Sequence, residues 1–520
     1  MAAGLARTAN DYDSLPYPSM PMAYTQPAHL AALATLFGLQ APLADRARVL
    51  ELGCAAGGNI IPLAARFPDA AFLGIDLSQR HVDDGRARIA QAGLTNVTLN
   101  QGDLTVLNLN GERFDYIICH GVFSWVPKPV QDAIFRLCRD NLTPHGMAAI
   151  SYNVLPGWHS RMAIRDICLH YAGGEGTPRQ RTARARAALE HIAEASDPSD
   201  PYGVLIRTEA KRLKSVPASY ILGEFLAPAN TAFHVRDFIH RAQDYQLGYL
   251  CEADLLAAVP PTLKPAIRDR LTSFATPDRT VAEQDIDYLT GRLFRRSILV
   301  RQPETGVRHV PGPERLGGLH AASPIRLDPD QTTENSAVFI DDRARPVTVG
   351  DATILRVFQW LSDAYPATVS LEDLTSAAGQ DPAMKARIER AVFTLVMSGR
   401  ASISALPLRV GSASPPCPKV WAFARMEAAS IQPWITSLNH AGVGATPILR
   451  TLLPYLDGTH DRAALRARLT EAFENGTLPV PVPETPPGQG HLDKARLNAV
   501  ADEYVEESIT YLARRALLEP

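Results

Sequence analysis

Residues 49–59 constrain the fold most strongly, because an apolar stretch runs there directly into a loop of glycine and alanine. The stretch reads Val-Leu-Glu-Leu, and the loop that follows reads Gly-Cys-Ala-Ala-Gly-Gly-Asn. Small residues let a ligand lie against the backbone, and a helix that begins behind the loop directs its N–H groups toward that ligand. The spacing Gly53-x-Ala55-x-x-Gly58 also fits a degenerate dinucleotide fingerprint, so the loop alone leaves the ligand open.

Two acidic residues follow at the ends of further apolar stretches. Asp76 ends the predicted strand over residues 72–76, where a carboxylate can accept hydrogen bonds from both hydroxyl groups of a ribose. Asp103 follows the next strand, in Gly-Asp-Leu. This order of strands predicts a Rossmann-like α/β domain whose ligand lies beyond the strand ends.

The second half of this domain has an equally regular pattern. Residues 114–119 predict a strand that ends at His120, residues 130–139 predict a helix, and residues 147–152 predict another strand. A Leu-x-Pro-x-Gly turn at residues 142–146 precedes that last strand. A nicotinamide-dependent enzyme is not expected to combine this turn with Asp103.

The ordered set of loop, acids and turn resembles class I methyltransferases that use S-adenosyl-L-methionine. The alternative is a Rossmann-type domain that has lost its cofactor. In the family, the glycine loop lies under the methionine part of the cofactor, the first acid binds the ribose, and the second lies near the adenine. The resemblance implies the following cofactor-binding residues in this chain: Glu51, Gly53, Ala55, Asp76, Leu77, Asp103, Leu104 and His120. His120 is also open to a second interpretation, as a base.

Motifs outside this domain narrow the resemblance. Residues 12–27, 120–127 and 151–159 are similar to motifs of bacterial methyltransferases that carry a methyltransferase regulatory domain, and residues 220–252 look like that domain. The best-known members resemble rickettsial protein lysine methyltransferases that modify outer membrane protein B. Gln26 and Gly223 stand where many members have histidine, and both departures leave the cofactor site intact.

The N-terminal motif is expected to act as a lid. Tyr17, Ser19 and Thr25 would then fold over the cofactor and add to its binding residues, and the alternative is a strap over the first helix. The same resemblance implies a homodimer through the middle region.

Four aromatic residues follow strand ends and are predicted to line a catalytic channel for the methyl acceptor. Phe123 and Trp125 come just after the fourth strand, and Tyr152 and Trp158 come with the fifth. Aromatic faces can hold a methylated cation, and a desolvated slot favours a neutral amine. Packing at a domain interface is the alternative for each of them.

Charge, cysteine content and hydropathy exclude several classes of protein. The net charge of −3 argues against a nucleic-acid partner. Six cysteines show neither a Cys-x-x-Cys pair nor a histidine at zinc spacing, so no metal site is expected. No apolar run is long enough to span a membrane, and the polar N-terminal residues are not typical of a signal peptide. The chain is therefore expected to be a cytoplasmic protein.

Several parts are predicted along the 520 residues. Two copies of an Ala-Thr-(Pro)-Ile-Leu-Arg repeat, at residues 352–356 and 445–450, indicate two C-terminal modules of winged-helix-like type. Without a basic recognition face, they are expected to bind proteins. A capping box at Ser370 and Asp373 predicts the second helix of the first module. The predicted order is an N-terminal lid and helix (1–44), a cofactor domain (45–155), a helical regulatory domain (156–300), a linker (301–340) and a C-terminal region (341–520).

The sequence predicts an S-adenosylmethionine-dependent methyltransferase, with protein lysine N-methylation as the leading interpretation. Two alternatives stay open: a small-molecule methyltransferase, and a cofactor-binding regulatory protein without catalysis.

Overall fold

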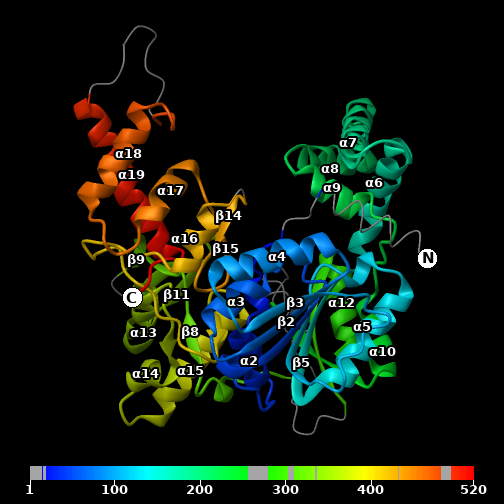
Figure 1. Cartoon of the computed structure of the whole chain (residues 1–520). Coiled ribbons are helices and arrows are strands. Elements are labelled where there is room, and N and C mark those ends of the chain that lie inside the picture. Colours follow the sequence, from blue (N-terminus) through cyan, green and yellow to red (C-terminus); the bar gives the residue numbers. More distant parts are fainter. Residues whose placement is uncertain are drawn as a thin grey trace. The chain divides into compact units, whose positions relative to one another are not determined.

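The computed structural model describes residues 15, 19–255, 279–302, 310–333, 336–430, 432–481 and 494–520. It divides the chain into two compact units (Figure 1). The first comprises residues 1–19, 33–64 and 68–311, and the second comprises residues 20–32, 65–67 and 312–520. Tyr17 lies outside the described residues.

A seven-stranded sheet is the centre of the first unit (Figure 1). Its order is β3-β2-β1-β4-β5-β7-β6. The first five strands are parallel, and β7 pairs antiparallel with both β5 and β6. The strands are β1 (Arg48–Leu52), β2 (Ala71–Asp76), β3 (Val97–Gln101), β4 (Phe114–Cys119), β5 (Leu142–Asn153), β6 (Leu247–Glu252) and β7 (Phe294–Arg301).

The inner strands are apolar because helices cover both faces of the sheet. On one face, α5 (Lys128–Asn141) and α10 (Val235–Asp244) pack on the strands through a single hydrophobic cluster. The opposite face carries α3 (Ile60–Arg66) and α4 (Gln79–Ala92). Helix α4 begins where the Ser78 side chain accepts a hydrogen bond from the N–H of His81, and ends at Gly93 with a positive φ of 65°.

The sheet corrects the predicted domain boundaries. The expected cofactor domain ended at residue 155, with a helical regulatory domain after it, yet β6 and β7 come from that region and complete the sheet. Helix α12 (Arg279–Thr290) packs on α10 beside them. The regulatory region and the cofactor domain therefore share one sheet.

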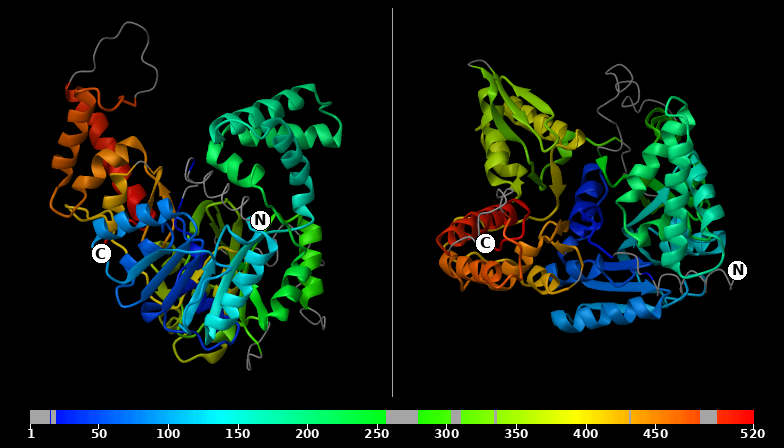
Figure 2. Two further views of the ribbon diagram at one scale, coloured as in Figure 1. Left: turned by 45° about the vertical axis from the view of Figure 1, so that its right-hand side comes forward. Right: turned by 90° about the horizontal axis from the view of Figure 1, so that it is seen from above.

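Four helices of the first unit form a bundle with its own core (Figure 2). Helix α7 begins with a capping box between Thr177 and Gln180, and the Asp200 side chain caps α8. The helices are α6 (Gly157–Ala172), α7 (Pro178–Ala195), α8 (Pro201–Lys214) and α9 (Ala218–Phe225).

The second unit contains two three-stranded sheets and two sets of helices. Residues 301–340 were predicted to be a linker, and the structure corrects this, because β8 (His320–Ala322), β9 (Arg326–Thr333) and β10 (Ser336–Ile340) lie there. Strand β11 (Pro346–Val349) pairs with β10, and β12 (Val369–Ser370) and β13 (Ser402–Ser404) flank β8.

The predicted repeat corresponds to two helical modules. In the first, α13 (Ala352–Ala364) and α15 (Pro382–Met397) flank α14 (Leu371–Ser376), which Ser370 caps as predicted. The second module follows the same order of helices, and Asp461 caps its middle helix. Its elements are α16 (Ala422–Ala428), β14 (Trp434–Thr436), β15 (Gly442–Gly444), α17 (Pro447–Leu452), α18 (Arg462–Glu474) and α19 (Lys494–Arg514).

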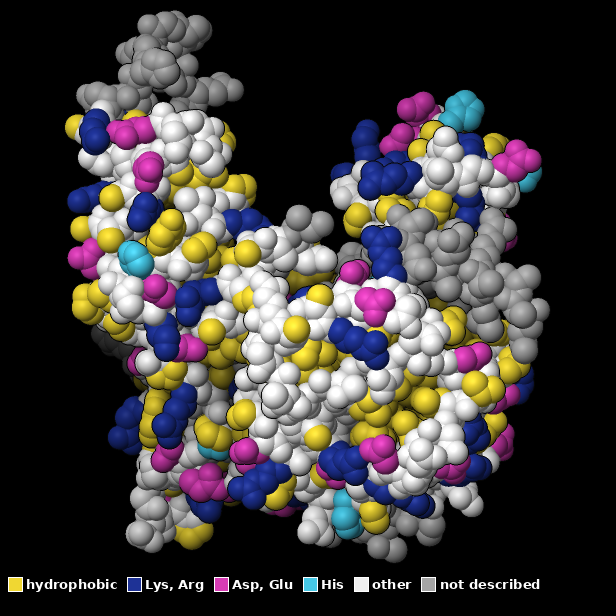
Figure 3. Space-filling model, in the orientation of Figure 1, with side chains coloured by type: hydrophobic (Ala, Val, Ile, Leu, Met, Phe, Trp, Pro, Cys, Tyr) yellow, Lys and Arg dark blue, Asp and Glu magenta, His cyan; other side chains and the backbone are white. Residues whose placement is uncertain are grey.

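The surface of the second module is mixed in charge. On the face drawn in Figure 3, acidic and basic side chains are interspersed among hydrophobic and uncharged ones. The ion pair between Arg466 and Asp502 is one example, at 3.1 Å. Among the helices that the structure describes, none combines the length and the apolar character needed to cross a membrane.

Candidate active site

The glycine loop is fixed at the carboxyl end of β1. The N–H groups of Gly53 and Cys54 both donate to the carbonyl of Ile75, at 2.7 and 3.1 Å. Gly53 has a φ of 75°, and a Cβ at this position would lie 2.3 Å from the Cγ2 of Val122. Glycine is therefore required at this position by both conformation and space. Ala55 also has a positive φ, 47°, although it carries a side chain.

Asp76 is held where its strand ends. One carboxylate oxygen accepts from the N–H of Ala55 at 2.8 Å, and the other accepts from the N–H of Ser78 at 2.9 Å. The side chain keeps 14% of its surface exposed. The Nδ1 of His81 lies 3.5 Å from Oδ1. Among the described residues, the Oδ2 accepts only the bond from Ala55, so the fixed carboxylate can still accept hydrogen bonds from a diol.

Glu51 lies beneath the loop and is only 4% exposed. Its Oε1 accepts from Asn59 at 2.9 Å, and its Oε2 is buried without a hydrogen-bond partner among the described residues. Burial raises the pKa of Glu51 to about 8; the hydrogen bond from Asn59 opposes this rise and the nearby Asp76 adds to it. The unpartnered oxygen fits a cationic amino group, as in the methionine part of S-adenosylmethionine.

Asp103 and Leu104 lie just after the carboxyl end of β3. The Asp103 Oδ1 accepts from the N–H and the hydroxyl of Thr105, both at 2.8 Å, so this turn uses one of the two carboxylate oxygens. Leu104 is 8% exposed and belongs to the core beneath. Leu77, after β2, is 37% exposed and offers an apolar surface for a flat ring.

His120 follows β4 and faces residues that come from β7. Its ring lies 6.0 Å from the ring of Phe294, nearly perpendicular to it, and the Arg296 guanidinium lies 5.4 Å from the centre of the same ring. Burial, together with the positive charge of Arg296, lowers the pKa of His120 to about 4. The imidazole is therefore neutral at physiological pH.

Two of the four predicted channel aromatics lie in the core instead, and the prediction is wrong for them. Phe123 is 0% exposed and contacts the rings of Phe135, Phe233 and Phe238. Tyr152 is 1% exposed and stacks on Phe238 at 3.8 Å. The short helix η3 (Phe123–Trp125) turns its first residue inward, which sequence position alone does not reveal.

Trp125 and Trp158 form the remaining aromatic pair. Trp125 is partly exposed, and its ring lies 5.8 Å from that of Trp158, at 73°. Trp158 is 1% exposed, and the Arg161 guanidinium lies 5.6 Å from its ring centre. Of the four predicted channel residues, Trp125 alone keeps an accessible surface, with Trp158 as its support.

The predicted lid residues have different positions. The Ser19 hydroxyl accepts from the N–H of Gly58 at 2.7 Å, which ties the N-terminal segment to the glycine loop. A Cβ at Gly58 would lie 2.1 Å from the Ser19 carbonyl, so this approach requires glycine. The prediction for Thr25 is wrong, because its side chain is 0% exposed and its hydroxyl donates to the carbonyl of Met22 at 2.8 Å.

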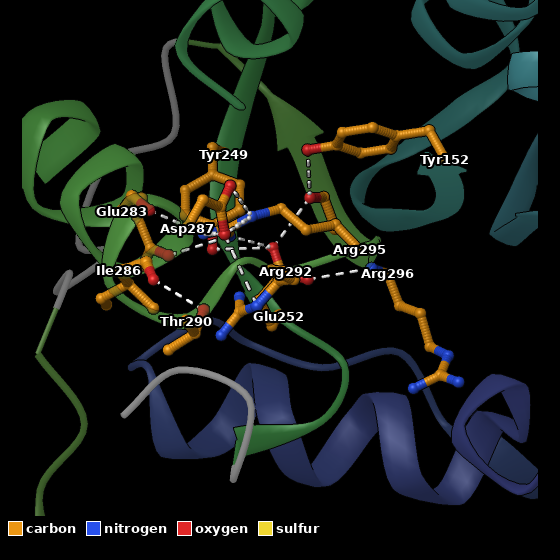
Figure 4. Close-up of polar contacts among 11 residues, drawn as sticks. Tyr152, Tyr249, Glu252, Glu283, Ile286, Asp287, Thr290, Arg292, Arg295 and Arg296 are labelled. Carbon is orange, nitrogen blue, oxygen red and sulfur yellow. Dashed lines mark hydrogen bonds and ion pairs between the residues drawn. The ribbon is translucent and has the colours of Figure 1, made fainter. Parts of the chain in front are cut away.

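Sequence reasoning missed the contribution of β7. Phe294 and Arg296 pair with Asn153 and Ser151 across the β5–β7 register and reach the same sheet edge as His120. Figure 4 shows the Arg296 side chain pointing away from the buried ion cluster around Arg295. The apolar run that follows, Ile-Leu-Val, is a strand signal, but nothing in the sequence pairs it with β5.

Three segments match known protein families. Residues 49–146 match a methyltransferase domain, residues 217–301 a predicted methyltransferase regulatory domain, and residues 417–517 a C-terminal winged helix domain of PKMT. These matches agree with the fold, the loop and the acids described above. The fold and site define a class I methyltransferase that uses S-adenosylmethionine.

Comparison with individual relatives identifies the family within this class. The chain is 31% identical over 493 residues to an uncharacterized protein of Rickettsia prowazekii, covering 91% of this chain and 88% of the relative. The structure of PKMT2 from Rickettsia typhi in complex with AdoHcy aligns with a TM-score of 0.84 at 27% identity, over 97% of this chain and 100% of that one. A trans-aconitate 2-methyltransferase of Methylobacterium nodulans is 34% identical over 187 residues, 36% of this chain and 65% of the relative. The chain belongs to the family of rickettsial PKMT-type methyltransferases.

Proposed function

We propose that the protein transfers a methyl group from S-adenosylmethionine to the side-chain amine of lysine in a protein substrate. The observation that carries this proposal is the likeness to PKMT2 over the whole chain, winged-helix region included. A small-molecule enzyme would need only the part that aligns with the trans-aconitate 2-methyltransferase. Lysine specificity would use the additional elements to hold a macromolecule.

The proposed cofactor contacts follow the sheet edge. The Gly53–Ala55 backbone supports the methionine part, with Glu51 at its amino group and His120 nearby. Asp76 takes the ribose hydroxyls, and Leu77, Asp103 and Leu104 border the adenine. Ser19 closes over the loop through Gly58, and Tyr17 belongs to the same lid proposal.

The reaction makes modest demands on protein groups. A lysine amine has an ordinary pKa of roughly 10.4 and must lose its proton before it attacks. His120, whose pKa is lowered to about 4, is a poor acceptor for that proton, because the equilibrium would strongly favour the ammonium ion. We therefore propose that His120 contacts the cofactor. The lysine amine loses its proton to solvent as it is desolvated on entering the site. Positioning and charge stabilisation then supply the catalysis.

Two further points belong to this proposal. One is a homodimer through the middle region, which the resemblance to methyltransferases with a regulatory domain implies. Light scattering of the purified protein tests that part, and a monomer at all concentrations contradicts it. The second point is that the protein is proposed to be located in the cytoplasm.

The function is tested in two stages. Isothermal titration with S-adenosylhomocysteine first establishes binding of the cofactor product. Transfer of a tritium-labelled methyl group is then measured to lysine-containing surface proteins and, in parallel, to trans-aconitate. Labelled lysine after hydrolysis supports the proposal, and labelled trans-aconitate alone would replace it with the small-molecule function.

A further inference from the structure

An amide pair lies at the carboxyl end of β5, next to the proposed acceptor side of the site. The Nδ2 of Asn153 donates to the Oδ1 of Asn230 at 3.1 Å. Asn153 is 2% exposed and is the last residue of β5. Asn230 lies between α9 and α10, in the region that matches the regulatory domain. The pair thus joins the sheet end to the regulatory region.

Backbone hydrogen bonds hold both amides in place. The Ser124 hydroxyl accepts from the N–H of Asn153 at 2.8 Å, and the Ser124 carbonyl accepts from the N–H of Thr231 at 2.8 Å. The Asn153 carbonyl accepts from the N–H of Phe233 at 2.9 Å. Ser124 directly precedes Trp125, so the amide pair and the accessible tryptophan are positioned by the same turn.

One end of this pair has no partner. The Asn230 Nδ2 is buried without a hydrogen bond in the described part of the chain. Buried polar groups of folded proteins are almost always hydrogen-bonded, so an unpaired one at a site edge points to a ligand. The oxygen and nitrogen of an amide have nearly the same shape, so both amides can turn over together and keep their mutual hydrogen bond. The free buried atom is then the Asn230 oxygen, an acceptor.

We propose that Asn153 and Asn230 form the subsite that holds the attacking amine, with the free end of Asn230 accepting a hydrogen bond from the amine N–H. This inference rests on the proposed lysine methylation. A neutral primary amine has two N–H donors and one lone pair. An acceptor on one N–H orients the lone pair while leaving it free to attack.

The same subsite serves the product. The lone pair forms the new N–C bond as the C–S bond breaks, so the positive charge passes from sulfur to nitrogen. The methylated ammonium keeps an N–H directed at the Asn230 oxygen, and the proton then leaves to water. Trp125, with Trp158 behind it, offers an aromatic face to the new cation.

The test compares three variants: Asn230→Ala, Asn230→Asp and the control Thr231→Ala. Thr231 is the exposed neighbour, and its alanine variant keeps the backbone N–H that donates to Ser124. Titration with S-adenosylhomocysteine shows whether each variant retains the cofactor site, and we expect dissociation constants that match the wild type.

Methyl transfer to a terminally blocked lysine peptide and to denatured casein is the second measurement. We expect Asn230→Ala to lower kcat/KM about tenfold to a hundredfold, as for a lost hydrogen bond to a group that becomes charged, and Thr231→Ala to leave it unchanged. In Asn230→Asp the carboxylate stabilises the lysine ammonium, so the pH–rate profile should move to higher pH.

The outcomes separate the two proposals. If the wild type labels lysine and Asn230→Ala matches Thr231→Ala in kcat/KM, the amide subsite is overturned and the lysine function stands. If the wild type binds S-adenosylhomocysteine but labels only trans-aconitate, the lysine function is overturned, and the amine subsite with it.

Discussion

The hydroxyl groups of Tyr152 and Ser297 lie 2.9 Å apart, and this contact ties β5 to a fully buried ion cluster (Figure 4). Ser297 donates onward to Glu252 at 2.8 Å. At the centre, the Arg295 guanidinium bonds Glu252 and Asp287 at 2.8 and 2.9 Å. The regulatory region is thus bound to the cofactor sheet through buried polar contacts as well as through strand pairing.

The cluster should govern stability. Arg295 is 1% exposed, so Arg295→Met leaves the carboxylates of Glu252, Glu283 and Asp287 buried without their central cation. We expect a loss of about 3–5 kcal/mol in the free energy of unfolding, measured by urea denaturation. Arg236→Ala is the control, because its pair with Asp237 is exposed and should contribute at most about 1 kcal/mol. Equal effects of the two variants would contradict a structural role for the cluster.

The strands of the cofactor domain were predictable because parallel strands buried on both faces read as apolar runs. The run that ends at Asp76 is β2, and the run that ends just before His120 is β4. Strands β6 and β7 were missed as parts of this sheet, because β7 joins it by pairing with β5, which is far away in sequence, and β6 joins it only through β7. Pairing over such a distance leaves no local periodicity to read.

Site residues whose role depends on backbone conformation were predictable from the sequence. Residues whose role depends on the direction of the side chain were not. Gly53 occupies a position that only a residue without Cβ can fill. Phe123 and Trp125 stand two residues apart, yet one enters the core and the other stays partly exposed. That difference depends on the turn of η3 and on the rings from α5 and α10 packed around Phe123.

Phe123 and Trp125 should therefore respond differently to truncation. Phe123→Ala removes a ring from a packed aromatic core and should cost about 3–5 kcal/mol of stability. Trp125→Ala should leave the melting temperature and the affinity for S-adenosylhomocysteine nearly unchanged but lower methyl transfer. Thermal unfolding, titration and methyl transfer compare the two. A parallel loss of cofactor affinity and activity in Trp125→Ala would remove it from the acceptor side.

Asp76 should contribute directly to cofactor affinity. Asp76→Ala is expected to weaken S-adenosylhomocysteine binding by about 1–3 kcal/mol, the range for hydrogen bonds to a charged group. The control is Asp83→Ala, because Asp83 lies on the exposed surface of α4. Isothermal titration measures both, and an unchanged dissociation constant for Asp76→Ala would exclude it from the ribose site. The melting temperature reports separately on the loss of its hydrogen bonds to Ala55 and Ser78.

Glu51 should couple cofactor binding to a proton. Burial raises its pKa from 4.5 to about 8, so at pH 7 the free protein holds Glu51 mainly in the neutral form. If the amino group of the cofactor binds its free oxygen, the charged form is favoured and a proton is released. Affinity for S-adenosylhomocysteine should then rise with pH between about 6 and 8. Titration in two buffers of different ionisation enthalpy measures this release, which should be close to one proton at pH 7.

Glu51→Gln supplies both the control and the stability prediction. Between pH 4.5 and about 8, folded Glu51 holds a proton that the unfolded chain has lost, so its contribution to stability falls as the pH rises through this window. The glutamine variant does not titrate there. Its melting temperature relative to the wild type should therefore be higher at pH 8 than at pH 5, while its proton release on binding disappears. A wild type that releases no proton, or a variant that releases as many, would show that Glu51 does not meet the amino group. Cofactor affinity would then have to come from the other proposed contacts, the backbone loop and Asp76 among them.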